Sequence, residues 1–222
     1  MEIVKRLYEY LLDLILPKKC IGCNRKDLFL CEDCFSLIEL NPNIYCPCDN
    51  LVKNYHCYQC SNISLDRLYS AADYNNTIIK KLVKEAKHIK QLTSYEAIII
   101  LMHLNEVSFS FENDMLMMPT PLSKKEERQQ GFNVAKEIIE IIHTEISIPY
   151  SFDNLIIKNS NLKIVNQEII KGKKILLINE VYEVNGTINK CAELLKNNKA
   201  EEVYGITLAR KINKVDRKGF FV

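Results

Sequence analysis

The chain has 222 residues, of which 47% are hydrophobic and 26% are charged, a composition typical of globular proteins and not of disordered ones. Its net charge of +2 excludes the global basic field of many nucleic-acid-binding proteins, so any such surface must be local. The longest apolar run, Ala97–Met102, is far shorter than the roughly 20 residues of a membrane span. We therefore expect no membrane span.

The first segment, Met1–Leu16, carries apolar residues at helical spacing and predicts a helix that packs on the rest of the fold. The alternative is a membrane-surface helix, which is disfavoured because its polar face mixes both signs of charge. Glu9 and Asp13 interrupt the apolar residues, and no small-residue cleavage site follows, so the segment does not resemble a secretory signal. We expect a cytoplasmic protein.

Eight of the nine cysteines lie between residues 20 and 60, where they form four close pairs: Cys20 and Cys23, Cys31 and Cys34, Cys46 and Cys48, Cys57 and Cys60. Paired cysteines in a cytoplasmic chain indicate metal ligands more often than disulfides. Eight thiolates would complete two tetrahedral zinc sites with no open position, so we interpret the zinc as structural. The spacing leaves open which pairs share a metal, and His56 is an alternative ligand beside the irregular third pair. Cys191 is expected to be a buried apolar residue.

The remainder of the chain alternates short apolar runs with helical patterns, which predicts an α/β fold with a parallel sheet and right-handed crossovers. Strands are expected over Asp66–Tyr74, Asp114–Met118, Ile175–Ile178 and Val203–Ala209. Helices are expected over Thr77–His88, Ser94–Asn105, Asn133–His143 and Ile188–Asn197. The polar segment Ser151–Lys174 is expected to be the most mobile. The predicted organisation is a helix at 1–16, a cysteine-rich module at 17–62 and an α/β domain at 63–222.

The most informative stretch is KILLINEVYEVNGTINK, in which the apolar run Ile175–Ile178 leads into Asn179 and Glu180. A short polar loop with Gly186 and Thr187 follows, and then a helical pattern begins. A buried strand that ends in a loop and a helix N-terminus is a natural phosphate site, because backbone N–H groups and the helix dipole point at the ligand. Acidic side chains at the end of the strand can bind sugar hydroxyls.

Two groups of basic residues have both a functional and an ordinary interpretation. Lys124, Lys125 and Arg128 follow the Pro119–Pro121 turn and would form a phosphate or single-stranded-DNA rim. Lys84 and Lys87 belong to a second basic face, on the helix predicted over Thr77–His88. Either group could instead be a solvated charge run, and Glu126 and Glu127 interleave the first of them.

Three features occur in order and together resemble the ComF family of competence-associated proteins. They are the cysteine pairs, the segment MPTPLSKKEERQQGFNVA, and the strand-loop-helix ILLINEVYEVNGT with the ending VYGITLAR. The resemblance covers nearly the whole chain. It implies a double zinc ribbon joined to a domain with the type I phosphoribosyltransferase fold, in which a parallel sheet is flanked by helices.

The resemblance also implies a ligand and the residues that would hold it. The family's acidic pair, which binds ribose with Mg²⁺ bridging to pyrophosphate, falls on Asn179 and Glu180, and its phosphate loop falls on the residues that follow. For phosphoribosyl pyrophosphate, the candidate binding residues are Thr120, Asn179, Glu180, Asn185, Gly186 and Thr187. Asn179 loses a charge, Glu183 would repel a phosphate, and Val184 replaces a donor, so the donor loop is degenerate.

Three functional hypotheses follow. In the first, a ComF-like protein serves DNA uptake in natural transformation and binds a phosphoribosyl or phosphate ligand, or single-stranded DNA, with impaired catalysis. In the second, the chain is an active Mg²⁺-dependent phosphoribosyltransferase with an unknown acceptor. In the third, the zinc module is a scaffold for a competence or recombination protein.

Overall fold

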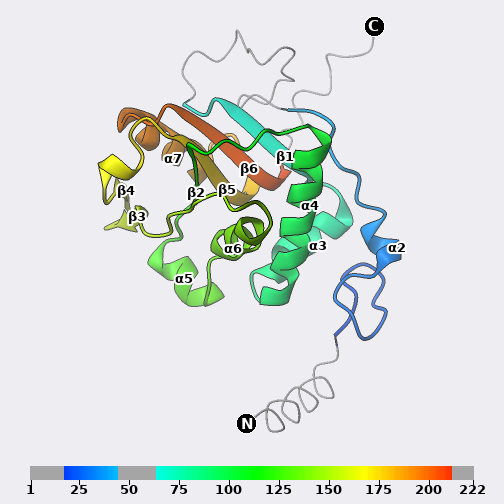
Figure 1. The fold of residues 1–222 in the computed structure, drawn as a ribbon. Coiled ribbons are helices and arrows are strands. Elements are labelled where there is room, and N and C mark those ends of the chain that lie inside the picture. The colour runs from blue at the N-terminus through cyan, green and yellow to red at the C-terminus, as the bar shows by residue number, and fades with distance from the viewer. Residues whose placement is uncertain (1–17, 45–63, 212–222) are drawn as a thin grey trace, which may run out of the picture.

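The computed structural model describes residues 18–44 and 64–211, and its centre is a parallel sheet of four strands. The strands are β1 (Arg67–Asp73), β2 (Met115–Pro119), β5 (Lys174–Tyr182) and β6 (Glu202–Arg210). Their order across the sheet is β1-β6-β5-β2, with every neighbouring pair parallel (Figure 1). The predicted α/β class with a parallel sheet is therefore confirmed. The helix expected over residues 1–16 lies outside the described residues.

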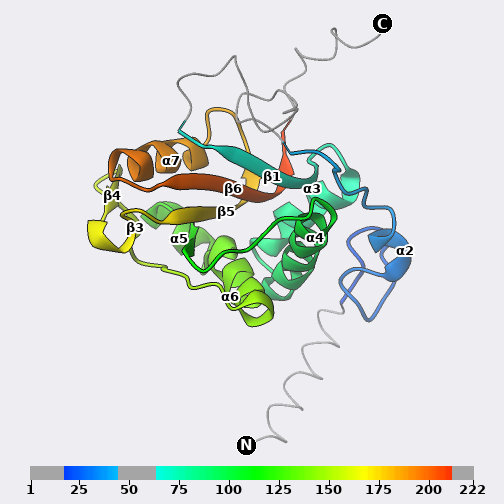
Figure 2. The same cartoon turned by 45° about the horizontal axis from the view of Figure 1, so that its top comes forward.

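Helices cover both faces of the sheet, as Figure 2 shows. One face packs against α3 (Thr77–Ala86), α4 (Thr93–Glu106) and α6 (Val134–Ile146), and the other packs against α7 (Thr187–Asn197). Within residues 64–211, each expected helix and strand is present and most of the ends are shifted, because hydrophobic spacing predicts the element better than its boundary. Within the described ranges, no helix is long and apolar enough to cross a membrane.

The smaller elements lie between these main ones. They are α2 (Glu32–Phe35), the 3-10 turns Lys90–Leu92 and Gln167–Ile169, α5 (Lys124–Gln130), and the hairpin of β3 (Leu155–Lys158) and β4 (Asn161–Ile164). The segment expected to be the most mobile thus contains a hairpin. The charge run after residue 123 forms α5, because Ser123 and Glu126 cap its N-terminus reciprocally and Gly131 ends it with a φ of 78°.

Strand β5 extends further than its apolar run, so the polar residues after the run belong to the strand. The sequence indicates a strand that ends at Ile178, but pairing with β6 continues through Asn179 and Tyr182. Asn179 and Glu180 therefore lie inside the strand and not in the loop after it. The pairing overrides the weak strand preference of these two residues, because tertiary context routinely overrides propensity.

Residues 18–44 pack directly on the α/β domain. Ile78 of α3 belongs to the same apolar cluster as three of the cysteines, and Tyr95 of α4 packs against that cluster. Lys81 donates a hydrogen bond to the carbonyl of Ile21 at 2.9 Å. The backbone N–H of Asn41 donates to the carbonyl of Ala71 on β1 at 2.8 Å. The first two cysteine pairs are thus attached to α3, α4 and the edge of the sheet.

Helix α4 buries a histidine that gives the fold a pH dependence. His103 is 1% exposed, and burial lowers the pKa of its imidazole to about 4. The unfolded chain takes up this proton near pH 6.5, so stability is lost as the pH falls from 6.5 towards 4. We expect His103→Gln to remove on the order of 3 kcal/mol of this acid destabilisation. Urea unfolding at pH 7 and pH 4 measures the free energy of unfolding at each pH. The exposed His88→Gln is the control, which should lose as much stability between the two pH values as the wild type.

Candidate functional site

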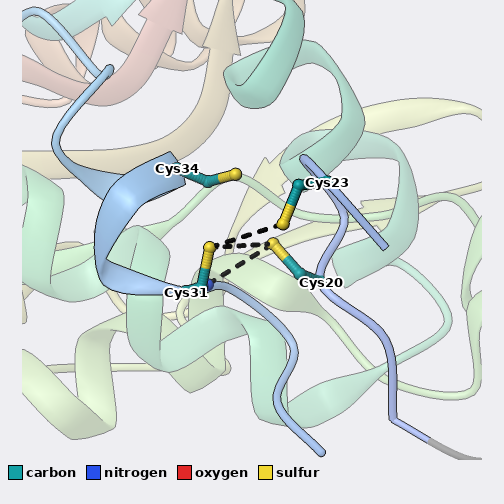
Figure 3. A group of neighbouring side chains, drawn as sticks. All are labelled: Cys20, Cys23, Cys31 and Cys34. Atoms are coloured by element: carbon teal, nitrogen blue, oxygen red, sulfur yellow. Dashed lines mark hydrogen bonds between the residues drawn. The ribbon is translucent and has the colours of Figure 1, made fainter. Parts of the chain in front are cut away.

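The first two cysteine pairs come together in space, which the spacing alone left open. The sulfur atoms of Cys20, Cys23, Cys31 and Cys34 all lie within 4.8 Å of one another, and their side chains converge in Figure 3. Cys31 Sγ lies 3.6 Å from both Cys20 Sγ and Cys23 Sγ. A tetrahedral zinc with Zn–S bonds of 2.3 Å separates its sulfurs by about 3.8 Å, whereas a disulfide separates them by about 2.05 Å.

The surroundings of Cys20 favour its thiolate form, whereas burial and the three neighbouring thiols raise the pKa of Cys34 to about 12. Burial opposes ionisation of Cys20, but backbone donors from Cys23, Cys31 and Gly22 outweigh it and lower the pKa of the thiol to about 6. Gly22 is required sterically, since a Cβ there would lie 2.4 Å from Cys34 Sγ. These four cysteines therefore fit zinc, which would cross-link two segments of a module too small to fold on its own core.

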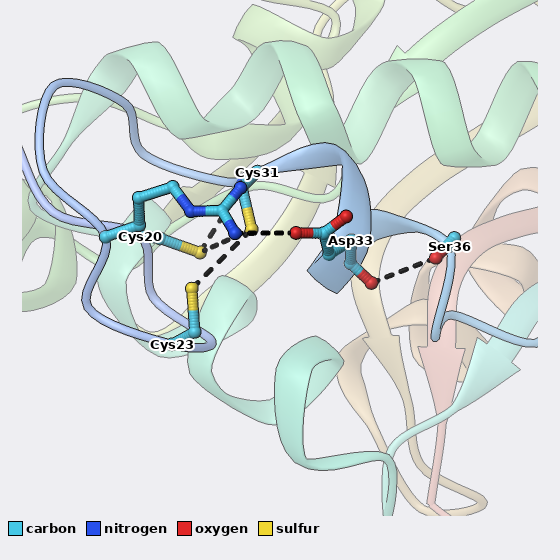
Figure 4. Close-up of polar contacts among 6 residues, drawn as sticks. Cys20, Cys23, Cys31, Asp33 and Ser36 are labelled. Carbon is cyan, nitrogen blue, oxygen red and sulfur yellow. Dashed lines mark hydrogen bonds and ion pairs between the residues drawn. The ribbon is translucent and has the colours of Figure 1, made fainter.

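An ion pair and a hydrogen bond support the second cysteine pair. Asp33 lies in the first turn of α2, between Cys31 and Cys34 in the sequence, and accepts a 2.7 Å hydrogen bond from Arg25. Ser36 Oγ donates to the carbonyl of Asp33 at 2.9 Å, and Figure 4 shows Asp33 and Ser36 beside the cysteines. The ion pair is exposed, so it contributes little to stability and mainly links the first loop to the second.

Five cysteines remain, and one of them lies within the described residues. Cys46, Cys48, Cys57 and Cys60 lie outside the described residues. Cys191 is fully buried in α7, and burial raises the pKa of its thiol to about 12. It is an apolar core residue, as predicted.

A second site is a cavity of about 250 Å³ at the carboxyl edge of the parallel sheet, where ligands of open α/β folds bind. It is lined by Lys87, Thr120, Pro121, Leu122, Glu126, Gln130, Ile157, Asn179, Glu180, Val181, Glu183, Gly186, Thr187 and Ile188. These residues come from the ends of β2, β5 and α3 and the segments that follow them, from α5, from the hairpin strand β3, and from the start of α7. The cavity thus collects side chains far apart in sequence.

The floor of the cavity joins β5 to β2 through Asn179. Its Oδ1 accepts a 2.8 Å hydrogen bond from Thr120 Oγ1, and its Nδ2 donates to the carbonyl of Val181 at 2.8 Å. The carbonyl of Thr120 in turn accepts from Asn133 Nδ2 at 3.1 Å. Asn179 therefore acts as a structural link between two strands, and its amide oxygen is already engaged by a donor.

Glu180 is the buried carboxyl of this cavity. It is 9% exposed, and burial raises its pKa, opposed by its own backbone N–H and by Lys87. Glu96 of α4 is fully buried, has no hydrogen-bond partner among the described residues, and has its pKa raised well above the usual range by burial and by Glu180. A buried carboxyl near a cavity, coupled to a second carboxyl, is a frequent mark of a functional site.

The turn between β5 and α7 also lines the cavity, through Glu183 and Gly186. The N–H of Gly186 donates to the carbonyl of Glu183 at 2.8 Å, and a Cβ on Gly186 would lie 2.9 Å from that oxygen. Asn189 holds the turn by donating to the carbonyl of Val184. Gly186 is the N-cap residue of α7, and no described side chain caps the helix. The first N–H groups of α7 are therefore open to an anion.

Most of the predicted ligand-binding residues meet at this cavity. Thr120, Asn179, Glu180, Gly186 and Thr187 line it, whereas Asn185 lies in the exposed turn and does not. Lys87, expected on a DNA-binding face, also lines the cavity. The other basic candidates, Lys84, Lys124, Lys125 and Arg128, are exposed outside it.

Sequence reasoning missed Glu126 and Glu96. The sequence Ser123-x-x-Glu126 matches a capping box, which predicts a helix N-terminus at this point. In a capping box the glutamate side chain points back toward the preceding loop. No sequence signal distinguished Glu96 from a surface residue of an apolar helix.

Scans against protein-family models and curated proteins gave no match. Among solved structures, the chain is similar to a purine phosphoribosyltransferase from Pyrococcus horikoshii, at 15% identity and a TM-score of 0.35 over 53% of this chain and 73% of that one. It is also similar to HGPRT-ase from Leishmania tarentolae in complex with GMP, at 12% and 0.34 over 61% and 72%. A hypoxanthine phosphoribosyltransferase from Staphylococcus aureus gives 19% and 0.33 over 65% and 68%.

Proposed function

We propose that the cavity at the carboxyl edge of the sheet binds a phosphoribosyl ligand and that the first two cysteine pairs hold a structural zinc. The observation that carries the ligand proposal is the meeting of the Glu180 carboxyl with the open N-terminus of α7 in one cavity. The helix N–H groups and Thr187 would bind the phosphate. Glu180 would accept hydrogen bonds from ribose hydroxyls.

An active Mg²⁺-dependent phosphoribosyltransferase is the less favoured alternative. Mg²⁺ is usually held by one or two carboxylates together with substrate phosphates. Here Asn179 replaces one carboxylate, and its amide oxygen is occupied by Thr120. Glu180 would be the main protein ligand, and bound Mg²⁺ would supply charge neutralisation for a diphosphate. The remaining donor set favours binding over catalysis.

The finer assignment within this proposal is a ComF-like role in DNA uptake. It is supported by the resemblance of the ordered motifs and by the close packing of residues 18–44 on the domain. The exposed residues Lys84, Lys124, Lys125 and Arg128 would contact single-stranded DNA outside the cavity. A competence or recombination protein would be the partner in such a role.

Calorimetric titration of the zinc-loaded full chain with ribose 5-phosphate tests the ligand proposal. We expect saturable one-to-one binding with a dissociation constant below about 1 mM, which corresponds to roughly 4 kcal/mol. A single-stranded oligonucleotide is then added to the same sample. Binding of DNA that weakens with salt supports the rim assignment. Absence of ribose 5-phosphate binding would refute the ligand proposal, whatever the result with DNA.

A further inference from the structure

The loop after β2 has almost no hydrogen-bond donors left for a ligand. Pro119 and Pro121 have no backbone N–H, and the N–H of Thr120 donates to the carbonyl of Ile178 at 3.0 Å. The N–H of Ser123 donates to Glu126 Oε2 at 2.8 Å. Within this loop, only Leu122 keeps a backbone N–H that no described residue accepts. A loop in this position cannot surround an anionic group with backbone donors.

The hydroxyl groups of the same loop are also engaged. Thr120 Oγ1 donates to Asn179, and Ser123 Oγ donates to Glu126 Oε2 at 2.6 Å. Hydrogen bonds from Ser123 lower the pKa of the Glu126 carboxyl, so Glu126 is an anion that faces the cavity from the first turn of α5. The β2 side of the cavity therefore presents a negative charge and few free donors to a second phosphate group.

The α7 side of the cavity is different. Thr187 and Ile188 line it, α7 has 11 residues, and its first turn contains no acidic residue. The open N–H groups there suit one phosphate group. The buried Glu180 lines the same cavity, and its own backbone N–H donates to its carboxyl group.

The charges of the lining side chains also favour a ligand with one phosphate group over a ligand with two. Among the lining residues, Lys87 is the one cation, against Glu126, Glu180 and Glu183. Lys87 already interacts electrostatically with Glu96, Glu126 and Glu180. Glu183 forms an ion pair with Lys211. The lining side chains therefore supply no cation beyond Lys87 to neutralise a diphosphate.

We propose that the cavity selects a ribosyl monophosphate, such as ribose 5-phosphate or a nucleoside 5′-monophosphate, and discriminates against a ribosyl ligand that carries a diphosphate. Glu126 is the specificity-determining residue. This inference rests on the proposed function, since it assigns the class of ligand at the same site.

Calorimetry on the zinc-loaded full chain tests it with three probes, each in the presence of Mg²⁺: ribose 5-phosphate, phosphoribosyl pyrophosphate and inorganic pyrophosphate. We expect wild-type protein to bind ribose 5-phosphate at least about tenfold more tightly than phosphoribosyl pyrophosphate. Glu126→Gln keeps the acceptor for Ser123 but removes the charge. It should tighten binding of phosphoribosyl pyrophosphate about tenfold and tighten binding of ribose 5-phosphate by a clearly smaller factor. The matched control is Glu127→Gln, which removes the same charge outside the cavity and should alter neither affinity.

The outcomes separate this inference from the proposed function. If ribose 5-phosphate binds but phosphoribosyl pyrophosphate binds as tightly or more tightly, the monophosphate preference is wrong and the proposed function stands. An equal response of the Glu126 and Glu127 variants would also overturn the role of Glu126, because it would indicate a general charge effect. If no probe binds, the proposed function fails and the inference fails with it.

Discussion

Replacing Cys31 with serine is expected to cost the protein one equivalent of zinc and to destabilise the whole chain. Cys31 is 2% exposed and lies 3.6 Å from the sulfurs of Cys20 and Cys23. A hydroxyl is a poor replacement for a thiolate at a tetrahedral zinc, and structural zinc supplies folding energy directly. We expect a loss of roughly 3 kcal/mol or more in the free energy of unfolding, and a melting temperature lower by about 10 °C.

The effect should reach the α/β domain because the zinc-binding residues are packed on it. Ile78 and Tyr95 contact the cysteine cluster, and Asn41 donates hydrogen bonds to β1 carbonyls. Loss of the metal would release these contacts from α3, α4 and the sheet edge. Elemental analysis and calorimetric melting measure both effects, and Cys191→Ala is the control for losing a buried cysteine. A Cys31→Ser protein with wild-type zinc content and melting temperature would contradict the zinc site.

Placing aspartate at Thr187 is expected to abolish ligand binding without destabilising the fold. Thr187 is the first residue of α7, is exposed, and lines the cavity. A carboxylate there is favourable for the helix dipole but would occupy the place of the phosphate. Two unit charges about 4 Å apart near a protein surface repel by about 4 kcal/mol, so affinity for ribose 5-phosphate should fall at least about 100-fold.

The control for Thr187→Asp is Asn197→Asp, which makes the same change in net charge at the exposed opposite end of α7. The two sites are about 15 Å apart, from a rise of 1.5 Å per residue. Calorimetric titration should show wild-type affinity for the Asn197 variant, and thermal melting should show no loss for the Thr187 variant. Ribose 5-phosphate binding that survives in Thr187→Asp would place the phosphate elsewhere.

The sequence predicts the sheet well because its strands are continuous apolar runs. Ile175–Ile178 is fully buried, and such runs are typical of parallel strands covered on both faces. The pairs Cys20–Cys23 and Cys31–Cys34 likewise predict a metal site through their spacing. Their meeting around one point depends on the chain path between them, which spacing does not specify.

The cavity was predicted only in part, because its shape depends on contacts between distant segments. The strand-loop-helix pattern identifies Glu180 and Thr187, which are close in sequence. Lys87 enters the cavity because α3 ends beside it, and a helical wheel shows this lysine on a basic face. The carboxylate of Glu126 is held at the cavity by the hydrogen bonds that it accepts from Ser123. Counting the charges along the sequence does not reveal this contact.

The hydrogen bond from Thr120 to Asn179 is a contact that the strand-loop-helix sequence pattern does not predict. The sequence suggests that asparagine weakens ribose binding by losing a charge. The structure adds that Asn179 Oδ1 accepts from Thr120, a link from β5 to the β2 side that an aspartate would keep, and that Asn179 Nδ2 donates to Val181 within β5, a bond that an aspartate would lose because it has no N–H. The substitution is therefore compatible with a structural role.

The most direct test of the central claim is an NMR titration of the zinc-loaded, ¹⁵N-labelled chain with ribose 5-phosphate. We expect the backbone amides of Gly186, Thr187 and Ile188 to shift most, together with that of Glu180, and to saturate at one equivalent of bound ligand. Shifts confined to Lys124, Lys125 and Arg128, or no shifts at a ligand concentration of about 10 mM, would contradict a phosphoribosyl site at the carboxyl edge of the sheet.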